Sequence, residues 1–403
     1  MKIFITGMGI VSALGNNVDE TLRSLREKRS GIAPLHYLKT SHTEFPVGEV
    51  KLTDEEMIHL LQIPQEEVST RTSLMGMLAV REALMSAQID VKDKYKMAFI
   101  SGTTVGGMDK SEQFYLDFLE NDSKNAYISS HDCGACTEMI ADYFGIFSQV
   151  DTISTACSSA ANAILLGAEL LKNGKADIVV AGGSECITKF HLNGFNTLMI
   201  LDKEPCRPFD ATRAGLNLGE GAAYVIMESA EHFEKRSKSL SEAKFMEIIE
   251  LAGTANTCDA YHQTASSPDG EGAYLAMKKA IENAGLEPKD IDYINAHGTG
   301  TQNNDVSEGN AIIRLFGEHI PPISSTKSFT GHTTSAAGSV ESVISILALQ
   351  HNFIPVNLNF STVMPELSFT PAMNEVPEKP LQRILSNSFG FGGNDTSLIF
   401  SRI

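Results

Sequence analysis

One cysteine stands where the chain is suited to covalent chemistry. Cys157 lies within Thr-Ala-Cys-Ser-Ser at 155–159, where a strand-like segment ends in small residues and a nearly all-apolar helical segment begins. A thiol at the start of a helix faces the positive end of the helix dipole, which favours the thiolate and predicts a nucleophile. The alternative is that Cys157 is only a small buried residue, as most cysteines are.

Two histidines lie in loops rich in glycine, serine and threonine. His297 follows a predicted strand, and His332 comes just before a second predicted buried helix. A lone histidine is more often structural or solvated. Two histidines in such loops are harder to explain that way, because loop ends above a rigid sheet are where catalytic groups are usually held.

A fourth segment, Asn-Ser-Phe-Gly-Phe-Gly-Gly at 387–393, combines three glycines with two phenylalanines. Such a loop can approach a ligand closely and aim a backbone N–H group at a developing oxyanion. A hairpin turn is the alternative for this segment alone.

The elements that must hold these loops alternate between strands and helices, which indicates an α/β fold. In the first half we expect strands at 2–5, 97–101, 150–154, 178–181 and 222–227, and helices at 18–27, 70–87 and 159–172. In the second half we expect strands at 245–251 and 293–296, and helices at 272–284, 305–315 and 336–350. The repetition predicts a duplicated architecture, with halves 1–243 and 244–403 connected over the surface by the polar segment 231–243.

Size and composition agree with a globular enzyme. A chain of 403 residues is too long for one ordinary hydrophobic core, so two fused halves are expected. No stretch reaches the roughly 18 to 20 apolar residues of a membrane helix. The formal charge of −18 argues against nucleic-acid and anionic-membrane binding. Six cysteines without the spacing of a disulfide framework predict free thiols in a reducing cytoplasm.

Three weaker patterns suggest other interpretations. The apolar start superficially resembles a signal peptide, but Gly7, Gly9 and a threonine interrupt it, so we interpret it as a buried strand entering a turn. The same glycines resemble a dinucleotide-binding loop, although Ser12 stands where a third glycine is required. Cys133 and Cys136 form a C-x-x-C pair that could bind a metal or act in redox chemistry, but no second pair completes a zinc site.

The main motifs together resemble the β-ketoacyl-acyl-carrier-protein synthases, nearest the synthase II type, in the thiolase superfamily. They are Thr-Ala-Cys-Ser-Ser at 155–159, His-Gly-Thr-Gly-Thr at 297–301, Lys-Ser-Phe-Thr-Gly-His at 327–332 and Asn-Ser-Phe-Gly-Phe-Gly-Gly at 387–393. Their order and spacing match, and further matches at 5–9, 206–210, 219–222 and 259–262 extend the resemblance over nearly the whole chain. The resemblance implies a thiolase-like, five-layered αβαβα fold built from two similar halves.

The resemblance also implies an activity and a catalytic set. The activity is that of a 3-oxoacyl-[acyl-carrier-protein] synthase, which performs a decarboxylative Claisen condensation with malonyl-acyl carrier protein in fatty acid biosynthesis. Cys157 would carry the acyl group as a thioester. His297 and His332 would bind the malonyl thioester carbonyl and promote loss of carbon dioxide, supported by the charged pair of Lys327 and Glu341.

Further residues are implied to shape the substrate site. Phe391 would gate access of the acyl chain, and its backbone N–H would form the oxyanion hole together with that of Cys157. Thr299 and Thr301 would contact the phosphopantetheine arm. The remaining residues implied to bind substrate are Phe389 and Thr264.

The chemistry is consistent with these roles. Two imidazole N–H donors aimed at the enolate oxygen stabilise the transition state more than the ground state, and a thioester separates acyl transfer from condensation. No metal or redox cofactor is expected, since the substrates arrive on the phosphopantetheine of an acyl carrier protein. The expected partners are this carrier protein and a second copy of the chain, with a related subunit as the alternative.

Several functions compete within this chemistry. A ketosynthase of a specialised polyene or polyketide pathway would share every catalytic residue, and segments 193–195 and 217–220 look similar to it as well. A biosynthetic thiolase would need a cysteine near the C-terminus, but the last one is Cys258. A non-catalytic chain-length factor would lack the nucleophile. Acyl-chain preference stays open, because the region around 131–136 is more polar than is usual for the family.

Overall fold

The computed structural model describes residues 1–64, 66–90, 92, 94–238, 246–374 and 376–403. Its strands are β1 (Ile3–Ser12), β2 (Met97–Gly102), β3 (Gln149–Ile153), β4 (Ile178–Glu185), β5 (Gly221–Ser229), β6 (Ile249–Cys258), β7 (Tyr293–Asn295), β8 (Ile323–Ser324), β9 (Arg383–Gly390) and β10 (Asn394–Arg402). Its α-helices are α1 (Val18–Arg26), α2 (Asp54–Leu61), α3 (Arg71–Ala87), α4 (Met108–Glu120), α5 (Cys133–Phe144), α6 (Ser159–Lys172), α7 (Lys189–Thr197), α8 (Ala230–Lys238), α9 (Glu271–Asn283), α10 (Gln302–Phe316), α11 (Lys327–Thr330) and α12 (Ala337–His351).

The strands form a mixed sheet whose two halves repeat one connectivity. The order is β3-β2-β4-β5-β1-β6-β10-β9-β7-β8, so the second five strands follow the order of the first five in reverse. The halves meet where β1 and β6 pair antiparallel through Phe4 with Glu250 and Ile5 with Ile249. The predicted duplication is therefore present in the strand order, whereas the expected boundary between 243 and 244 lies outside the described residues.

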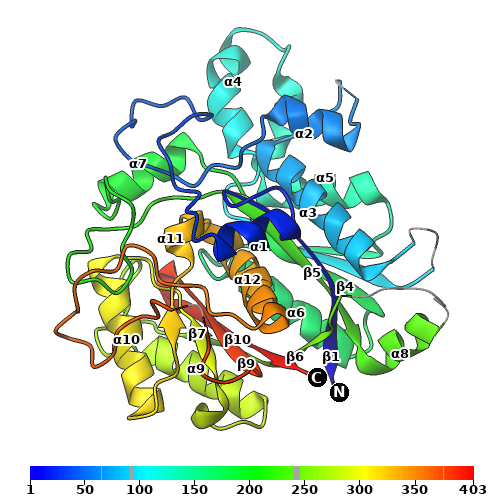
Figure 1. Ribbon diagram of the computed structural model, residues 1–403. Coiled ribbons are helices and arrows are strands. Elements are labelled where there is room, and N and C mark those ends of the chain that lie inside the picture. Colours follow the sequence, from blue (N-terminus) through cyan, green and yellow to red (C-terminus); the bar gives the residue numbers. More distant parts are fainter. Residues whose placement is uncertain (65, 91, 93, 239–245, 375) are drawn as a thin grey trace.

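Helices cover the two halves of the sheet in layers (Figure 1). Helix α3, with α2 and α5 beside it, packs on one side of the first half, and α9 and α10 pack together against the second half. Helices α6 and α12 lie between the halves, where α6 contacts β2 and β4 and α12 contacts β5 and β9. This gives the expected αβαβα arrangement, and it places the starts of two buried helices close together at its centre.

The N-terminal strand is longer than the sequence predicts. The turn expected at Gly7 and Gly9 is wrong, because β1 continues through both glycines and pairs with β5 as far as Ser12. A Cβ atom on Gly9 would lie 2.1 Å from the carbonyl oxygen of Ala79 in α3, and one on Gly7 would lie 2.5 Å from that of Ala83. The glycines thus allow close packing of a helix on the strand, and the dinucleotide-loop interpretation is wrong as well.

Most other predicted elements are confirmed within a few residues, including the helices that begin at 159, 271 and 337. Strand β6 continues to Cys258, beyond its predicted end at 251, and the predicted start at 245 lies outside the described residues. The polar segment expected to connect the halves begins as helix α8, and its part from 239 onward is likewise outside them.

The cysteines behave as the sequence predicts, since all six thiols are free. Cys136 is buried beneath α3 and Cys133 is half-buried at the start of α5. Among the described residues, no third histidine, cysteine or carboxylate lies close enough to this pair to complete a metal site. No helix in the described ranges combines the length and the apolar character needed to cross a bilayer.

Candidate active site

Cys157 lies on a sharp turn between β3 and α6. Ala156 adopts φ +53°, a left-handed conformation that is costly for a residue with a side chain. The Ser159 hydroxyl stabilises the turn, because it accepts from the backbone N–H of Thr155 at 2.9 Å and donates to the carbonyl of Ala156 at 2.6 Å. The sulfur is therefore held just outside the first turn of α6, where the sequence predicts it.

Asn394, near the C-terminus, stabilises this turn through hydrogen bonds. The Asn394 side-chain oxygen accepts from the Ser158 hydroxyl at 2.7 Å and from the amides of Asn162 and Asn256 at 2.8 Å each. These bonds tie the glycine-rich loop after β9 to the turn of the nucleophile. The sequence contains no local signal for this role, because two of the three partners lie more than 200 residues away.

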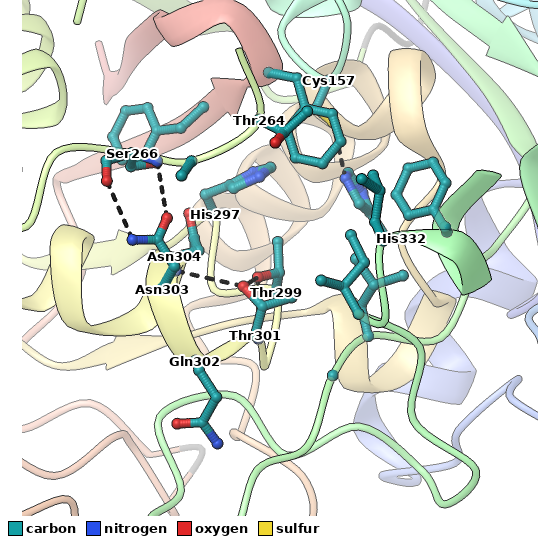
Figure 2. A pocket seen from close by; sticks show the side chains of 18 of the residues that line it. Cys157, Thr264, Ser266, His297, Thr299, Thr301, Gln302, Asn303, Asn304 and His332 are labelled. Carbon is teal, nitrogen blue, oxygen red and sulfur yellow. Dashed lines mark hydrogen bonds between the residues drawn. The ribbon is translucent and has the colours of Figure 1, made fainter. Parts of the chain in front are cut away.

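Both predicted histidines reach the sulfur. The Nε2 atom of His332 lies 3.1 Å from the Cys157 sulfur, and this sulfur and one ring nitrogen of each histidine all lie within 4.8 Å of one another. The imidazole rings of His297 and His332 are perpendicular, with centroids 5.3 Å apart. All three side chains are buried, and Figure 2 shows them around one cavity. Three loops that are distant in sequence therefore converge as predicted.

Lys327 determines which nitrogen of His297 carries the proton. Its ammonium group donates to the His297 carbonyl at 2.6 Å and lies 3.3 Å from Nδ1 of the same residue. An ammonium group only donates, so Nδ1 must accept and the proton of the neutral ring resides on Nε2. Burial, followed by the charge of Lys327 and the neighbouring His332, lowers the pKa of His297 well below its usual value. The residue therefore presents a neutral N–H donor to the cavity.

The loop of His297 is held by carboxylates that the sequence analysis missed. Glu308 in α10 accepts from the backbone N–H groups of His297 at 2.9 Å and Gly298 at 2.8 Å. One turn earlier in the helix, Asp305 accepts from Gly300 N–H at 3.1 Å. Two acids three residues apart on a helix that follows the loop were a usable signal, because spacing of this kind places both on one face.

The protonation of Cys157 differs from the expectation. Burial raises the pKa of its thiol to about 11, although Lys327 and the backbone N–H of Phe391 act in the opposite direction. The helix start favours the thiolate, but burial opposes this effect and keeps the thiol protonated in the unliganded protein. The thiol must lose its proton during the reaction, and His332 is the base within reach. Burial and Lys327 lower the pKa of His332 well below its usual value, so its ring is neutral and able to accept.

A cavity of about 310 Å³ opens above the three side chains. It is lined by every residue predicted to bind substrate, namely Thr264, Thr299, Thr301 and Phe389, and also by Phe391, the residue predicted to gate access of the acyl chain. The hydroxyls of Thr299 and Thr301 are 2.9 Å apart, and Ser266 and Asn303, which also line the cavity, are joined by two hydrogen bonds (Figure 2). Phe391 stacks on Phe195, with ring centroids 5.9 Å apart. Lys327 and Glu341 do not line this cavity and lie behind His297.

The Lys327–Glu341 pair supports a prediction about stability. The two groups are 1% and 2% exposed and 2.5 Å apart. Replacement of Lys327 by methionine leaves the Glu341 carboxylate buried without its counter-charge, which should lower the free energy of unfolding by about 3–5 kcal/mol. Replacement of both residues by apolar ones should recover most of this loss. Urea unfolding at pH 8 measures both effects.

The pH dependence of this loss has a definite sign. Burial raises the pKa of Glu341 from 4.5 to about 7, so the folded protein binds more protons than the unfolded chain between these values and loses stability as the pH rises through them. Lys327 lowers this pKa, so in the Lys327→Met variant the buried carboxyl group resists ionisation to a higher pH. The loss of stability relative to the wild type should therefore be largest above pH 7, where the wild-type carboxylate is charged. Lys235→Met, which removes an exposed pair with Glu231, is the control and should leave the unfolding midpoint unchanged. Equal effects of the two substitutions would contradict the prediction.

Comparison with known proteins agrees with this geometry. The family model described as "Beta-ketoacyl synthase, N-terminal domain" matches residues 1–232, and "Beta-ketoacyl synthase, C-terminal domain" matches 248–361. The 3-oxoacyl-[acyl-carrier-protein] synthase 2 of Coxiella burnetii is 33% identical over 100% of this chain and 99% of its own length. Nodulation protein E of Rhizobium meliloti is 32% identical over the same shares.

A solved structure gives the same result for the fold. The ketosynthase ApeO of Xenorhabdus doucetiae, determined in complex with its chain length factor ApeC, superimposes with a TM-score of 0.84 at 30% identity, over 100% of this chain and 98% of the other. The thiolase-like fold implied by the sequence motifs is therefore confirmed. The chain belongs to the β-ketoacyl synthase family of condensing acyltransferases.

Proposed function

We propose that this protein is a 3-oxoacyl-[acyl-carrier-protein] synthase of fatty acid biosynthesis. It takes an acyl chain onto Cys157 and condenses that chain with malonyl-acyl carrier protein. The observation that carries the proposal is the convergence of one thiol and two neutral imidazoles, His297 and His332, on a single cavity. The similarity to the Coxiella synthase 2 supports the choice of pathway.

Acyl transfer comes first. The Cys157 thiol passes its proton to Nε2 of His332 as the sulfur attacks the thioester carbonyl of the acyl carrier protein. The oxyanion accepts from the backbone N–H groups of Cys157 and Phe391, the second of which bonds to the sulfur in the unliganded site. The carbon–sulfur bond to the carrier then breaks, and the proton held by His332 leaves on the carrier thiol.

Decarboxylation and condensation follow. The bond between the malonyl carboxylate and its α-carbon breaks, carbon dioxide leaves, and the electron pair forms an enolate whose oxygen accepts from Nε2–H of His297 and His332. After acyl transfer the neutral ring of His332 carries its proton on Nδ1, so it becomes a donor to the enolate only once it has lost that proton and taken one up from solvent on Nε2. No partner among the described residues holds the proton on Nδ1. The enolate carbon then attacks the acyl thioester, and Cys157 is released as 3-oxoacyl-carrier protein forms.

These steps move only protons and electron pairs, so we propose that the enzyme needs no metal or redox cofactor. The ammonium group of Lys327, 3.3 Å from Nδ1 of His297, would repel a second cation placed among the three side chains. The free thiols favour a cytoplasmic location. We further propose that residues 1–243 and 244–403 are the two halves, the first with the nucleophile and the second with both histidines.

A second copy of the chain is the proposed partner besides the acyl carrier protein. Helix α4 exposes Tyr115, Leu116 and Leu119 by 63%, 70% and 70%, and Val150 is exposed on β3, the edge strand of the sheet. Exposed apolar side chains and an uncovered sheet edge are each typical of a surface that another subunit covers. A heterodimer with a related subunit is the alternative, supported by the likeness to a ketosynthase solved with its chain length factor.

A ketosynthase of a specialised polyene or polyketide pathway is the second candidate. It is favoured by the 30% identity to ApeO over the whole chain, which is close to the identity to the synthase 2 relatives. The catalytic steps would be the same, and only the acyl group on Cys157 would differ.

Intact-protein mass spectrometry tests both candidates. The protein is incubated with acyl carrier proteins that carry short saturated, long saturated or polyunsaturated acyl groups, and the adduct on Cys157 is timed. Faster loading of saturated groups, followed by 3-oxoacyl product when malonyl-carrier protein is added, is the expected result. Faster loading of polyunsaturated groups would favour the specialised pathway, and no adduct with any carrier would overturn the proposed function.

A further inference from the structure

We infer that Asp259 and Asp395 form a carboxyl pair that shares one proton and thereby positions the glycine-rich loop 390–393. This loop carries the Phe391 N–H that faces the Cys157 sulfur. Both acids are positioning residues, since neither lines the cavity. The inference rests on the proposed function, because the loop that this pair positions carries the proposed oxyanion donor.

The two side chains converge on one point at the start of helix α9. A Cβ atom on Gly272 would lie 2.1 Å from Oδ2 of Asp395 and 2.7 Å from Cβ of Asp259. Only a glycine in the first turn of α9 leaves room for both acids. Asp395 is the second residue of β10 and lies two residues after the loop, whereas Asp259 directly follows the end of β6.

Asp259 is also bonded to the loop through the main chain. Its N–H donates to the carbonyl of Gly393 at 2.8 Å, and Gln263, four residues later, accepts from Gly392 N–H at 2.8 Å. A Cβ atom on Gly393 would lie 2.8 Å from Cβ of Asp259, so the loop and the segment from 259 to 263 are in close contact. Any shift of Asp259 is therefore transmitted to the loop.

The hydrogen bonds of the pair leave one proton to be supplied. Oδ2 of Asp259 accepts from Ser267 N–H at 2.7 Å, but its Oδ1 is buried without a partner among the described residues. No hydrogen-bond donor of the described residues reaches the Asp395 carboxyl group. A proton on Asp395, donated to Oδ1 of Asp259, would satisfy both groups. Two carboxylates without that proton would face each other with no counter-charge.

The charged groups around the pair favour the protonated form. Glu308 of α10 is the other acid that faces Asp395, and the residues opposite it in the sheet, Thr257 and Phe389, are uncharged. Glu271 of α9 is half-buried and paired with Arg314. Burial, followed by the charges of Asp259 and Glu308, raises the pKa of Asp395 to about 8. At neutral pH the shared proton is therefore present, and it is lost as the pH rises through 8.

Loss of the proton should weaken one half of the oxyanion hole. Repulsion between Asp259 and Asp395 moves the loop, and Phe391 N–H moves with it. Removal of one oxyanion donor costs roughly 10²–10³-fold in rate at most. We therefore expect the rate of Cys157 acylation to fall above pH 8, although deprotonation of a thiol alone would make it rise.

The test is a pH profile of single-turnover acylation, followed by intact-protein mass spectrometry from about pH 6.5 to about 9.5. The wild type should lose rate with an apparent pKa near 8. Asp395→Asn should lose no rate there, because its amide donates to Asp259 at every pH. Asp259→Asn, the second variant in case the first does not fold, should reduce the loss as well, because it removes the like charge of Asp259 and leaves only that of Glu308. Asp269→Asn alters an exposed acid and should behave as the wild type.

Hydrogen exchange of the loop separates this inference from the proposed function. Peptides that cover residues 388–396 should lose protection above pH 8 in the wild type, after correction for the intrinsic exchange rate, and should keep it in Asp395→Asn. This readout requires no acyl transfer, so it holds even if no carrier protein loads Cys157. A loss of rate and protection near pH 8 that persists in Asp395→Asn would overturn the inference.

Discussion

Replacement of Cys157 by alanine is expected to abolish the acyl adduct and to lower condensation by roughly 10⁴-fold or more. The reason is geometric, because the sulfur of Cys157 is the only thiol among the described residues that lies within 4.8 Å of ring nitrogens from both histidines. Without it, the acyl group cannot be held as a thioester while the malonyl enolate forms. Intact-protein mass spectrometry and product formation from malonyl-carrier protein measure the two losses.

The same variant should still release carbon dioxide from malonyl-carrier protein. Its enolate donors, His297 and His332, are untouched, and the hydrogen bonds that Lys327 and Glu308 make to the His297 segment do not involve the sulfur. Cys258→Ala is the control, because Cys258 is the exposed cysteine and would account for non-specific acylation. An adduct that survives in Cys157→Ala but disappears in Cys258→Ala would refute the assignment of the nucleophile.

Much of the fold could be predicted because its central elements are apolar over their whole length. Helix α12 is buried throughout its first thirteen residues, so its sequence indicates a buried helix in any context. The end of strand β1 was predicted wrongly, because Gly7 and Gly9 were interpreted as a turn although they lie inside the strand. Gly7 and Gly9 instead make room for α3, which lies some 70 residues later in the chain, and no local pattern reveals that contact.

The site was predictable as far as motifs report local turns. Thr-Ala-Cys-Ser-Ser and the two histidine loops indicate where reactive side chains emerge, and those positions converge as expected. What the sequence could not give was the environment of the thiol, since the direction of the Cys157 pKa depends on burial by segments far away in the chain. Asn394 and Asp395 were missed for the same reason, because every partner that explains them is distant in sequence.

Replacement of His297 by alanine should separate decarboxylation from acyl transfer. The ring supplies a neutral Nε2–H donor for the enolate oxygen, and its loss should slow carbon dioxide release by roughly 10²–10³-fold. Acylation of Cys157 should change by only about 3-fold, because the base within reach of the sulfur is His332, at 3.1 Å. Time courses of carbon dioxide release and of the acyl adduct, taken on the same preparation, measure the ratio.

Two variants make this separation decisive. His297→Gln retains an N–H donor without a titratable ring, and it should restore a substantial part of the decarboxylation lost in His297→Ala. His332→Ala should slow both steps, because that residue is proton acceptor for the thiol and donor to the enolate. If His297→Ala slowed acylation as much as decarboxylation, the division of labour would be wrong. The two imidazoles would then act as one unit, although only His297 has a tautomer fixed by an ammonium group.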